Sequence, residues 1–125
     1  MSRILVVEDN IGISNFVWVN LTLRGYQINN AYSGKDALAL LKTQPPQLLL
    51  LDIWLPDMSG YDLLDACAES ELTSSIPVIA FTAAAPEERE RLEKHPQIAE
   101  VLYKPVSANQ LLAAIQRHLS VTAGT

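Results

Sequence analysis

Acidic, hydroxyl and amine side chains follow short apolar runs at several points of this sequence. The acids are Glu8, Asp9 and Asp52, and the other two residues are Thr82 and Lys104. Three carboxylates in one pocket would repel, each pair by about 4 kcal/mol at about 4 Å under an effective dielectric of about 20. A hard divalent ion such as Mg²⁺ or Mn²⁺ relieves that repulsion, because it binds oxygen ligands and leaves positions open for a phosphoryl group. If these residues converge, they predict a metal site beside which Lys104 supplies further positive charge.

The elements that would bring these residues together alternate along the chain as short apolar runs and longer segments of helical period. The predicted strands are 4–7, 26–30, 48–51, 78–81 and 101–103. Most of them are apolar on both faces, as buried parallel strands must be, whereas 26–30 is mixed and is predicted at a sheet edge. The alternation predicts an α/β fold, a doubly wound five-stranded parallel sheet of order 2-1-3-4-5 with five helices. In such sheets the functional residues gather beyond the carboxyl ends of the strands, where the acids, threonine and lysine stand.

The five helices are predicted from apolar spacing and from capping residues. Residues 13–21 carry apolar side chains at helical spacing, and Gly25 follows them as a helix-ending glycine. Ser33, Ser59 and Ser107 each begin a capping-box pattern. A fourth, charged helix begins at residue 86, a proline, and is expected to be largely exposed. Each predicted strand is therefore followed by a helix, as a doubly wound sheet requires.

Length and composition predict one globular unit. An apolar fraction of 49% in 125 residues suffices for one closed core, so we predict a domain over 1–120 and a flexible tail over 121–125. The net charge of -5 is spread along the chain without a basic stripe, which disfavours direct nucleic-acid binding. The apolar runs are far shorter than the roughly 20 residues of a membrane helix, and the one cysteine, Cys67, permits no internal disulfide. We therefore expect a cytoplasmic protein that contacts no membrane.

Four stretches of the sequence together resemble the receiver domain of response regulators, the CheY-like module of two-component signalling. The stretches are 4–10, 51–60, 77–83 and Lys104-Pro105. Thr82 lies 30 residues after Asp52 (82 minus 52) and Lys104 lies 52 after it (104 minus 52), separations close to those of the family. Each motif is weak evidence alone, but the ordered set spans nearly the whole chain and is specific.

The resemblance implies an acceptor and a set of metal ligands. Asp52 is the implied phosphoacceptor. Asp9 and Asp52 are the implied direct ligands of Mg²⁺ or Mn²⁺, Glu8 is implied to act through water, and the backbone carbonyl of Trp54 completes the set.

The resemblance also implies roles for the residues around the phosphoryl group. The hydroxyl of Thr82 and the amine of Lys104 are implied to bind phosphoryl oxygens through charge-assisted hydrogen bonds. Ala83 is implied to leave room for the group, and Pro105 to follow a cis peptide bond.

The implied function is a phosphorylation switch. The phosphoryl donor is a phosphohistidine on a histidine kinase or histidine phosphotransfer protein, and the protein is no conventional enzyme beyond its own metal-assisted phosphorylation and slow dephosphorylation. Phosphorylation draws Thr82 inward and repacks the surface of the fourth helix, fifth strand and fifth helix, which an unknown output protein distinguishes. We expect a monomer or a weak homodimer through that same surface.

Two departures from the family pattern affect these expectations. Val101 stands three residues before the lysine, where receivers usually carry an aromatic switch residue. Tyr103 shares the strand parity of Val101 and could substitute for it, although a tyrosine with a purely structural role remains the competing interpretation. Trp54 is bulky beside the acceptor, and Ala84 has no polar group to orient a hydrolytic water, so we predict a long-lived phosphorylated form.

Other functions remain open on the sequence. A degenerate receiver that acts only as an interaction scaffold is kept open by Val101. A phosphatase that forms an aspartyl phosphate typically has a second aspartate two residues after the first, and Trp54 occupies that place. A flavodoxin-like nucleotide or flavin binder would share the fold, but the sequence has no glycine-rich or hydroxyl-rich phosphate loop after its first strand.

Overall fold

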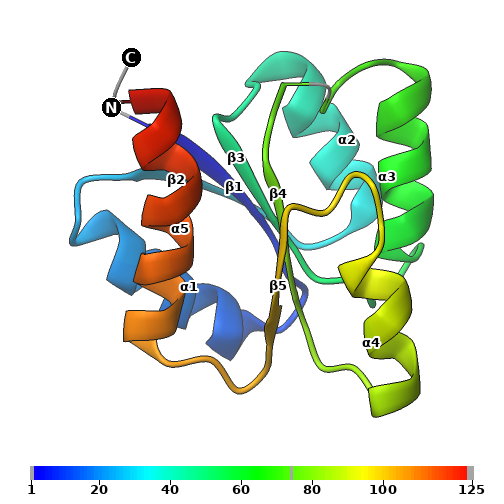
Figure 1. Cartoon of the computed structure of the whole chain (residues 1–125). Coiled ribbons are helices and arrows are strands. Elements are labelled where there is room, and N and C mark those ends of the chain that lie inside the picture. Colours follow the sequence, from blue (N-terminus) through cyan, green and yellow to red (C-terminus); the bar gives the residue numbers. More distant parts are fainter. Residues whose placement is uncertain (1, 74, 124–125) are drawn as a thin grey trace.

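The chain alternates strand and helix from Arg3 to Ala123 (Figure 1). In the computed structural model, residues 2–73 and 75–123 are described, with side chains as far as residue 119. The strands are Arg3–Val7 (β1), Gln27–Ala31 (β2), Leu48–Leu51 (β3), Val78–Thr82 (β4) and Glu100–Tyr103 (β5). The helices are Ile11–Thr22 (α1), Gly34–Thr43 (α2), Gly60–Glu69 (α3), Pro86–Glu93 (α4) and Ala108–Ala123 (α5).

The five strands form one parallel sheet in the order β2-β1-β3-β4-β5. This confirms the predicted fold class and strand order. The predicted strand 48–51 has the bounds of β3, and the other strands begin or end one residue away from their predicted limits. β2 is an edge strand, as its mixed composition predicted, and its first residue, Gln27, is exposed.

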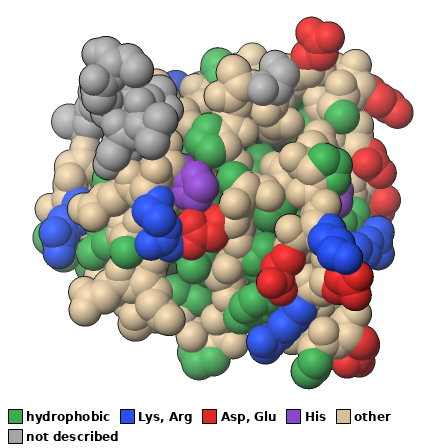
Figure 2. Space-filling model, viewed as in Figure 1, with side chains coloured by type: hydrophobic (Ala, Val, Ile, Leu, Met, Phe, Trp, Pro, Cys, Tyr) green, Lys and Arg blue, Asp and Glu red, His purple; other side chains and the backbone are tan. Residues whose placement is uncertain are grey.

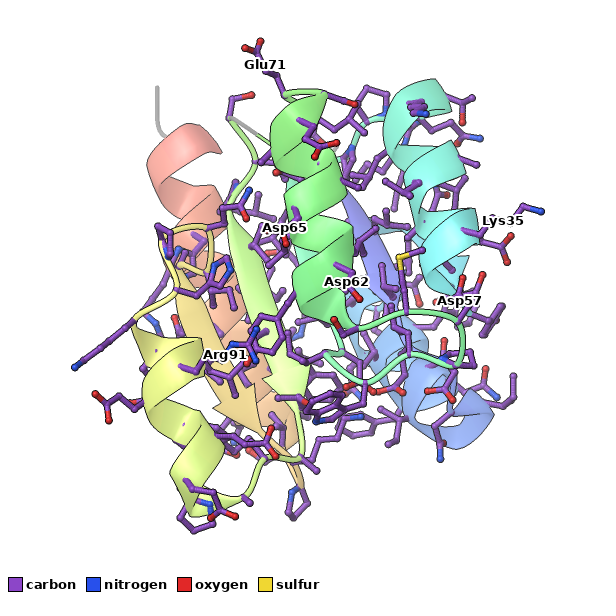
Figure 3. The ribbon with its side chains drawn as sticks, turned by 90° about the vertical axis from the view of Figure 1, so that its right-hand side faces the viewer. Lys35, Asp57, Asp62, Asp65, Glu71 and Arg91 are labelled. Carbon is purple, nitrogen blue, oxygen red and sulfur yellow. The ribbon has the colours of Figure 1, made fainter. Side chains whose placement is uncertain are left out.

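Helices cover both faces of the sheet, with α1 and α5 on one face and α2, α3 and α4 on the other (Figures 1 and 3). Successive residues of a strand point to opposite faces. In β3, Leu48 and Leu50 accordingly join the core under α1 and α5, whereas Leu49 and Leu51 join the core under α2 and α3. All four leucines are buried, which explains why this strand needs apolar residues throughout.

The serines predicted to begin helices do so through their side chains. The hydroxyl of Ser33 accepts a hydrogen bond from the N–H of Asp36, and the hydroxyl of Ser59 accepts one from the N–H of Asp62. Ser107 exchanges two such bonds with Gln110, which completes the predicted capping box at α5. Capping by these residues fixes where the helices start, and thereby the lengths of the loops that follow the strands.

The helices also bear on two other predictions. Within α4, Leu92 is the buried residue, so the prediction of a largely exposed fourth helix is confirmed. Among the described residues, no helix combines the length and the apolar character needed to cross a membrane. α5 continues to Ala123, beyond the predicted domain boundary at residue 120. The predicted tail over 121–125 falls partly outside the described residues, and the division at 120 stays a prediction.

Candidate functional site

Three carboxylates converge where β1 and β3 end. Val7 and Leu51 are register partners on these neighbouring strands, so the residues that follow them leave the sheet side by side. One carboxylate oxygen from each of Glu8, Asp9 and Asp52 lies within 4.8 Å of the others. Glu8 and Asp52 are buried, with 1% and 6% of their surface exposed, whereas Asp9 is exposed to solvent. The predicted convergence of the acids is therefore present, and it opens to solvent on the side of Asp9.

Thr82 and Lys104 contact opposite oxygens of the Asp52 carboxylate. The Thr82 hydroxyl donates a hydrogen bond to Oδ1 of Asp52 at 3.0 Å, and the Lys104 ammonium donates one to Oδ2 at 3.2 Å. The same ammonium donates to Oε1 of Glu8 at 2.5 Å. The backbone N–H of Trp54 also donates to Oδ1 of Asp52, at 3.1 Å. Asp52 is thus held by a hydroxyl from the end of β4, a cation from the residue after β5 and a backbone amide from its own loop.

The charges in the pocket are unevenly balanced. Burial raises the pKa of the Glu8 carboxyl above its usual value; the hydrogen bond from Lys104 opposes this effect and the charge of Asp52 adds to it. Burial alone would lower the pKa of Lys104, but its hydrogen bond to Glu8 and the charges of Asp52 and Glu8 outweigh burial and raise the pKa. Lys104 is therefore a cation at neutral pH. It is one positive charge against the three acids.

The donor set of the pocket fits a hard divalent ion. All three acids offer carboxylate oxygens, which Mg²⁺ and Mn²⁺ prefer over nitrogen or sulfur ligands. Lys104 can neutralise one of the carboxylates, and a divalent cation would balance the negative charge of the other two. The exposed position of Asp9 leaves room for the water ligands that Mg²⁺ usually retains. The acidic cluster is of the type that receiver domains use to hold Mg²⁺.

The loop after Asp52 is held in place by contacts that the sequence reasoning missed. Both carboxylate oxygens of Asp57 accept backbone N–H groups at the start of α2, from Gly34 at 2.8 Å and from Lys35 at 3.0 Å. Figure 3 shows Asp57 beside the start of α2, close to Lys35. These backbone hydrogen bonds hold the pKa of Asp57 below its usual value. The loop is therefore attached to α2 as well as to the sheet.

Gly60 closes this loop at a point where no side chain fits. A Cβ atom at residue 60 would lie 2.8 Å from Cα of Ile53 and 3.2 Å from the carbonyl oxygen of Asp52. Its N–H donates to the carbonyl of Ile53 at 2.6 Å. The start of α3 can approach the acceptor loop this closely because residue 60 is a glycine.

Tyr103 connects β5 to α4. Its hydroxyl donates a hydrogen bond to Glu93 at 2.6 Å, and the guanidinium of Arg89 lies 4.2 Å from the centre of its ring. Burial raises the pKa of Tyr103 to about 12, and the hydrogen bond to Glu93 adds to the effect. Val101 and Tyr103 pack against the same core, which confirms that they share a face of the sheet. Val101 has no polar group and makes only packing contacts.

The remaining predicted residues lie around the same edge. Ala83 follows Thr82 directly and is exposed. The Lys104–Pro105 peptide bond is cis, as the resemblance implied. Beside Lys104 lies an apolar hollow of about 500 Å³ that no sequence signal indicated. Its walls come from α1, β4 and the loop before α5, and the lining residues are Asn10, Gly12, Ile13, Phe16, Phe81, Lys104, Pro105 and Val106.

Known proteins share both the sequence pattern and the fold. The family model of the response regulator receiver domain matches residues 4–116. The DNA-binding dual master transcriptional regulator RpaA of Synechocystis sp. is 31% identical over 123 residues, which are 98% of this chain and 51% of the regulator. The probable cyclic di-GMP phosphodiesterase of Vibrio cholerae is 36% identical over 116 residues, which are 93% of this chain and 26% of that protein. The chain thus spans about half the length of the first relative and about a quarter of the second.

Two solved structures superpose on nearly the whole chain. The CheY-like receiver domain protein from Methanospirillum hungatei JF-1 is 28% identical with a TM-score of 0.89, and the match covers 99% of this chain and 98% of that one. The chemotaxis response regulator CheY4 of Vibrio cholerae is 26% identical with a TM-score of 0.85, over 94% of this chain and 98% of that one. With its sheet order, its acidic pocket and Lys104 in place, the chain belongs to the family of response regulator receiver domains.

Proposed function

We propose that Asp52 accepts a phosphoryl group from a phosphohistidine on a partner histidine kinase or histidine phosphotransfer protein. The observation that supports this most directly is the pair of contacts on its carboxylate, from Thr82 at one oxygen and from Lys104 at the other. A hydroxyl and a cation beside a nearly buried carboxylate are the groups that would bind the oxygens of a transferred phosphoryl group.

The same pocket would hold Mg²⁺ or Mn²⁺ during the reaction. Asp9 and Asp52 would bind the ion directly, Glu8 through a water molecule, and Trp54 through its backbone carbonyl. A divalent ion there would neutralise charge on the phosphoryl oxygens. The excess of carboxylates over ammonium groups in the pocket supports this assignment.

The reaction would be an in-line displacement at phosphorus. A carboxylate oxygen of Asp52 forms the new P–O bond while the P–N bond of the phosphohistidine breaks, and the leaving imidazole takes up a proton from solvent. Lys104 stays protonated and pairs with a phosphoryl oxygen. The Thr82 hydroxyl exchanges its bond to Oδ1 of Asp52 for a bond to the phosphoryl group, and the small side chain of Ala83 leaves space for it.

The movement of Thr82 would reach the output surface through Tyr103. The two residues are register partners on β4 and β5, and Tyr103 is bound to α4 through Glu93 and Arg89. Val101, at the usual aromatic position, has no comparable contact with α4. We therefore propose that Tyr103 transmits the change to the surface formed by α4, β5 and α5, which an output protein would recognise.

The protein would be a cytoplasmic signalling module that acts through protein contacts, with no direct binding of nucleic acid or membranes. The net charge of -5 supports this, because an acidic surface is repelled by phosphate backbones and by anionic lipids. Its own chemistry would be limited to accepting and slowly losing one phosphoryl group.

The decisive experiment is phosphorylation by acetyl phosphate with Mg²⁺, read by intact-mass spectrometry. Wild type should gain the mass of one phosphoryl group, and Asp52→Asn should gain none. The matched control is Asp62→Asn, which removes an exposed carboxylate at the start of α3 and should be phosphorylated like wild type. A mass gain in Asp52→Asn would place the acceptor elsewhere.

The same experiment separates the alternative functions. A scaffold that never takes up phosphate would show no gain in any variant. A phosphatase would turn over acetyl phosphate continuously without retaining the group, and Trp54, in place of a second aspartate, is the observation against it.

A further inference from the structure

The outer face of α1 exposes an unusual amount of apolar surface. Among the described residues, five of the seven large hydrophobic side chains that are exposed belong to α1 or to its C-cap. They are Ile11 (60% exposed), Phe16 (38%), Trp18 (46%), Val19 (46%) and Leu23 (78%). Exposed apolar side chains gathered on one element often mark a surface to which another protein binds.

This apolar surface has no role in the core of the domain. The core-facing side of α1 is formed by Ser14, Val17 and Leu21, which are buried. A surface helix normally carries polar or charged residues on its other side. The sequence of α1, from Ile11 to Thr22, contains no acidic or basic residue at all. Figure 2 shows by contrast that side chains of both charges gather over α4.

Four of the outward positions form a regular seam. Gly12, Phe16, Val19 and Leu23 follow one another at spacings of 4, 3 and 4 residues, the pattern that lines one side of a helix in helix–helix packing. Leu23 keeps a right-handed helical backbone, so it continues the seam. We name these four residues the α1 seam.

The α1 seam is complementary to itself in an antiparallel arrangement. About a two-fold axis between residues 17 and 18, position 12 lies opposite position 23 of the other copy, and position 16 lies opposite position 19. Gly12 has no side chain. A Cβ atom built at this position would lie 3.3 Å from Oδ1 of Asn10 and would otherwise face open space. Leu23, the most exposed of the large side chains, would fill that gap. Phe16 of each copy would contact Val19 of the other copy, so this contact occurs twice, as in any isologous interface.

We infer that two copies of this chain associate through the α1 seam, antiparallel about that axis. A second copy fits better than a charged partner, because an uncharged face does not repel its own duplicate although the chain as a whole is acidic. The exposed apolar side chains could bury of the order of 500 Å² on each copy, below the roughly 800 Å² per partner of stable complexes. The dimer should therefore be weak, with a dissociation constant in the micromolar range or above. It is distinct from the homodimer through α4, β5 and α5 that the family resemblance led us to expect.

Sedimentation velocity over a wide range of protein concentration tests the association. Wild type should show a concentration-dependent dimer, and Val19→Glu should raise its dissociation constant at least tenfold. Val19 is half-exposed, so the substitution should leave the fold intact, which a thermal melt verifies. The matched control is Ala39→Glu on α2, an exposed helical position that receives the same charge and should dimerise like wild type. A chain that stays monomeric at all concentrations overturns the inference.

Cysteine cross-linking tests the orientation. In the antiparallel dimer, a chain with Gly12→Cys and a chain with Leu23→Cys should form a disulfide with each other under mild oxidation. Either variant alone should not, since two copies of position 12 would lie roughly 16 Å apart along the helices, too far for a disulfide. The native thiol of Cys67 is buried and does not interfere. Cross-linking of each variant with itself contradicts the antiparallel seam.

Two further outcomes would give the outer face of α1 another partner or place the dimer contact on another surface. A dimer that survives Val19→Glu must form through another surface, such as that of α4, β5 and α5. If Val19→Glu leaves self-association unchanged but slows phosphorylation by a donor protein, the face serves that protein. Either result rejects the α1 dimer.

Discussion

Thr82 and Tyr103 are register partners on β4 and β5, so the hydroxyl that contacts Asp52 and the phenol that contacts α4 extend from adjacent positions of the sheet. These neighbouring residues therefore offer a short connection between the acidic pocket and α4. Val101 pairs with Ala80, two pairs further from the pocket, so we expect Tyr103 and not Val101 to respond to a movement of Thr82.

Tyr103→Phe should separate phosphorylation from the response of α4. The ring and its contact with Arg89 remain, but the hydrogen bond to Glu93 is lost, which should cost about 1 kcal/mol of stability. Uptake of phosphate from acetyl phosphate should be unchanged, because the hydroxyl does not contact Asp52. The amide shifts of 86–93 in nuclear magnetic resonance spectra should change less on phosphorylation than in wild type. Glu93→Ala, which removes the acceptor of the same hydrogen bond, should behave similarly, and an unchanged response in both variants would exclude the proposed connection.

Asp9→Asn should weaken Mg²⁺ binding at least tenfold, because it removes the charge of a proposed ligand from a site whose attraction is electrostatic. Trp54, two residues after Asp52 and 49% exposed, makes tryptophan fluorescence a suitable readout of a Mg²⁺ titration. Asp62→Asn, which lowers the charge equally outside the pocket, should titrate like wild type. Equal affinities in the two variants would show that Asp9 is no ligand.

The ionised carboxylate of Glu100 should stabilise the fold at neutral pH, and this stabilisation should be lost in acid. Hydrogen bonds from Arg117, and then from His118, hold its pKa below the usual 4.5 against the opposing effect of burial. A carboxyl with a lowered folded-state pKa stabilises the fold at pH values above its unfolded-state pKa, and this stability is lost as pH falls through the folded-state pKa. Urea unfolding between pH 7 and pH 3 should show a smaller loss of stability in Glu100→Gln than in wild type. The contribution should be modest, because the partner Arg117 is largely exposed.

Gly60→Ala should destabilise the domain by about 1 to 3 kcal/mol and slow phosphorylation, since the new methyl group meets backbone atoms of Ile53 and Asp52. Gly34→Ala is the matched comparison. There the added atom meets the flexible side chain of Met58, which can move away, so the loss should be smaller. Thermal unfolding measures both, and the reverse order would mean that the acceptor loop can yield at residue 60.

The phosphorylated form should be long-lived. Ala84, two residues after Thr82, offers no polar group that could orient an attacking water, and Trp54 stands beside the acceptor. Ala84→Gln should shorten the lifetime several-fold, whereas Ala84→Val, which adds no polar group, should not. The decay is followed by intact mass after removal of acetyl phosphate. Loss of the group within a few seconds in wild type would contradict the prediction.

The sequence predicted those parts of the molecule that depend on local pattern. Four consecutive leucines favour a buried strand. A parallel sheet then brings the residue that follows, here Asp52, to the edge where Glu8 and Asp9 also emerge. The strand order followed from the alternation of elements and from the polar composition of β2.

Contacts between separate elements could not be predicted in this way. The hydrogen bond of Tyr103 to Glu93 depends on the angle at which α4 packs on β5, and the bonds of Asp57 to α2 depend on the path of a loop. Neither leaves a periodic signal. The exposure of the α1 seam required the structure too, because apolar residues on all sides of a helix predict burial until the opposite side is seen to have no partner.

The two hydrogen bonds that join Asp57 to the start of α2 should make the α2 side of the pocket more rigid than the α4 side. On the α2 side, the acceptor loop is fastened to a helix by two backbone bonds, so a strain produced at Asp52 finds little freedom there. On the other side, α4 is held by the buried Leu92 and by side-chain contacts of Tyr103 with Glu93 and Arg89 and of Arg91 with Tyr61. We therefore expect a chemical event at the pocket to displace α4 more than α2.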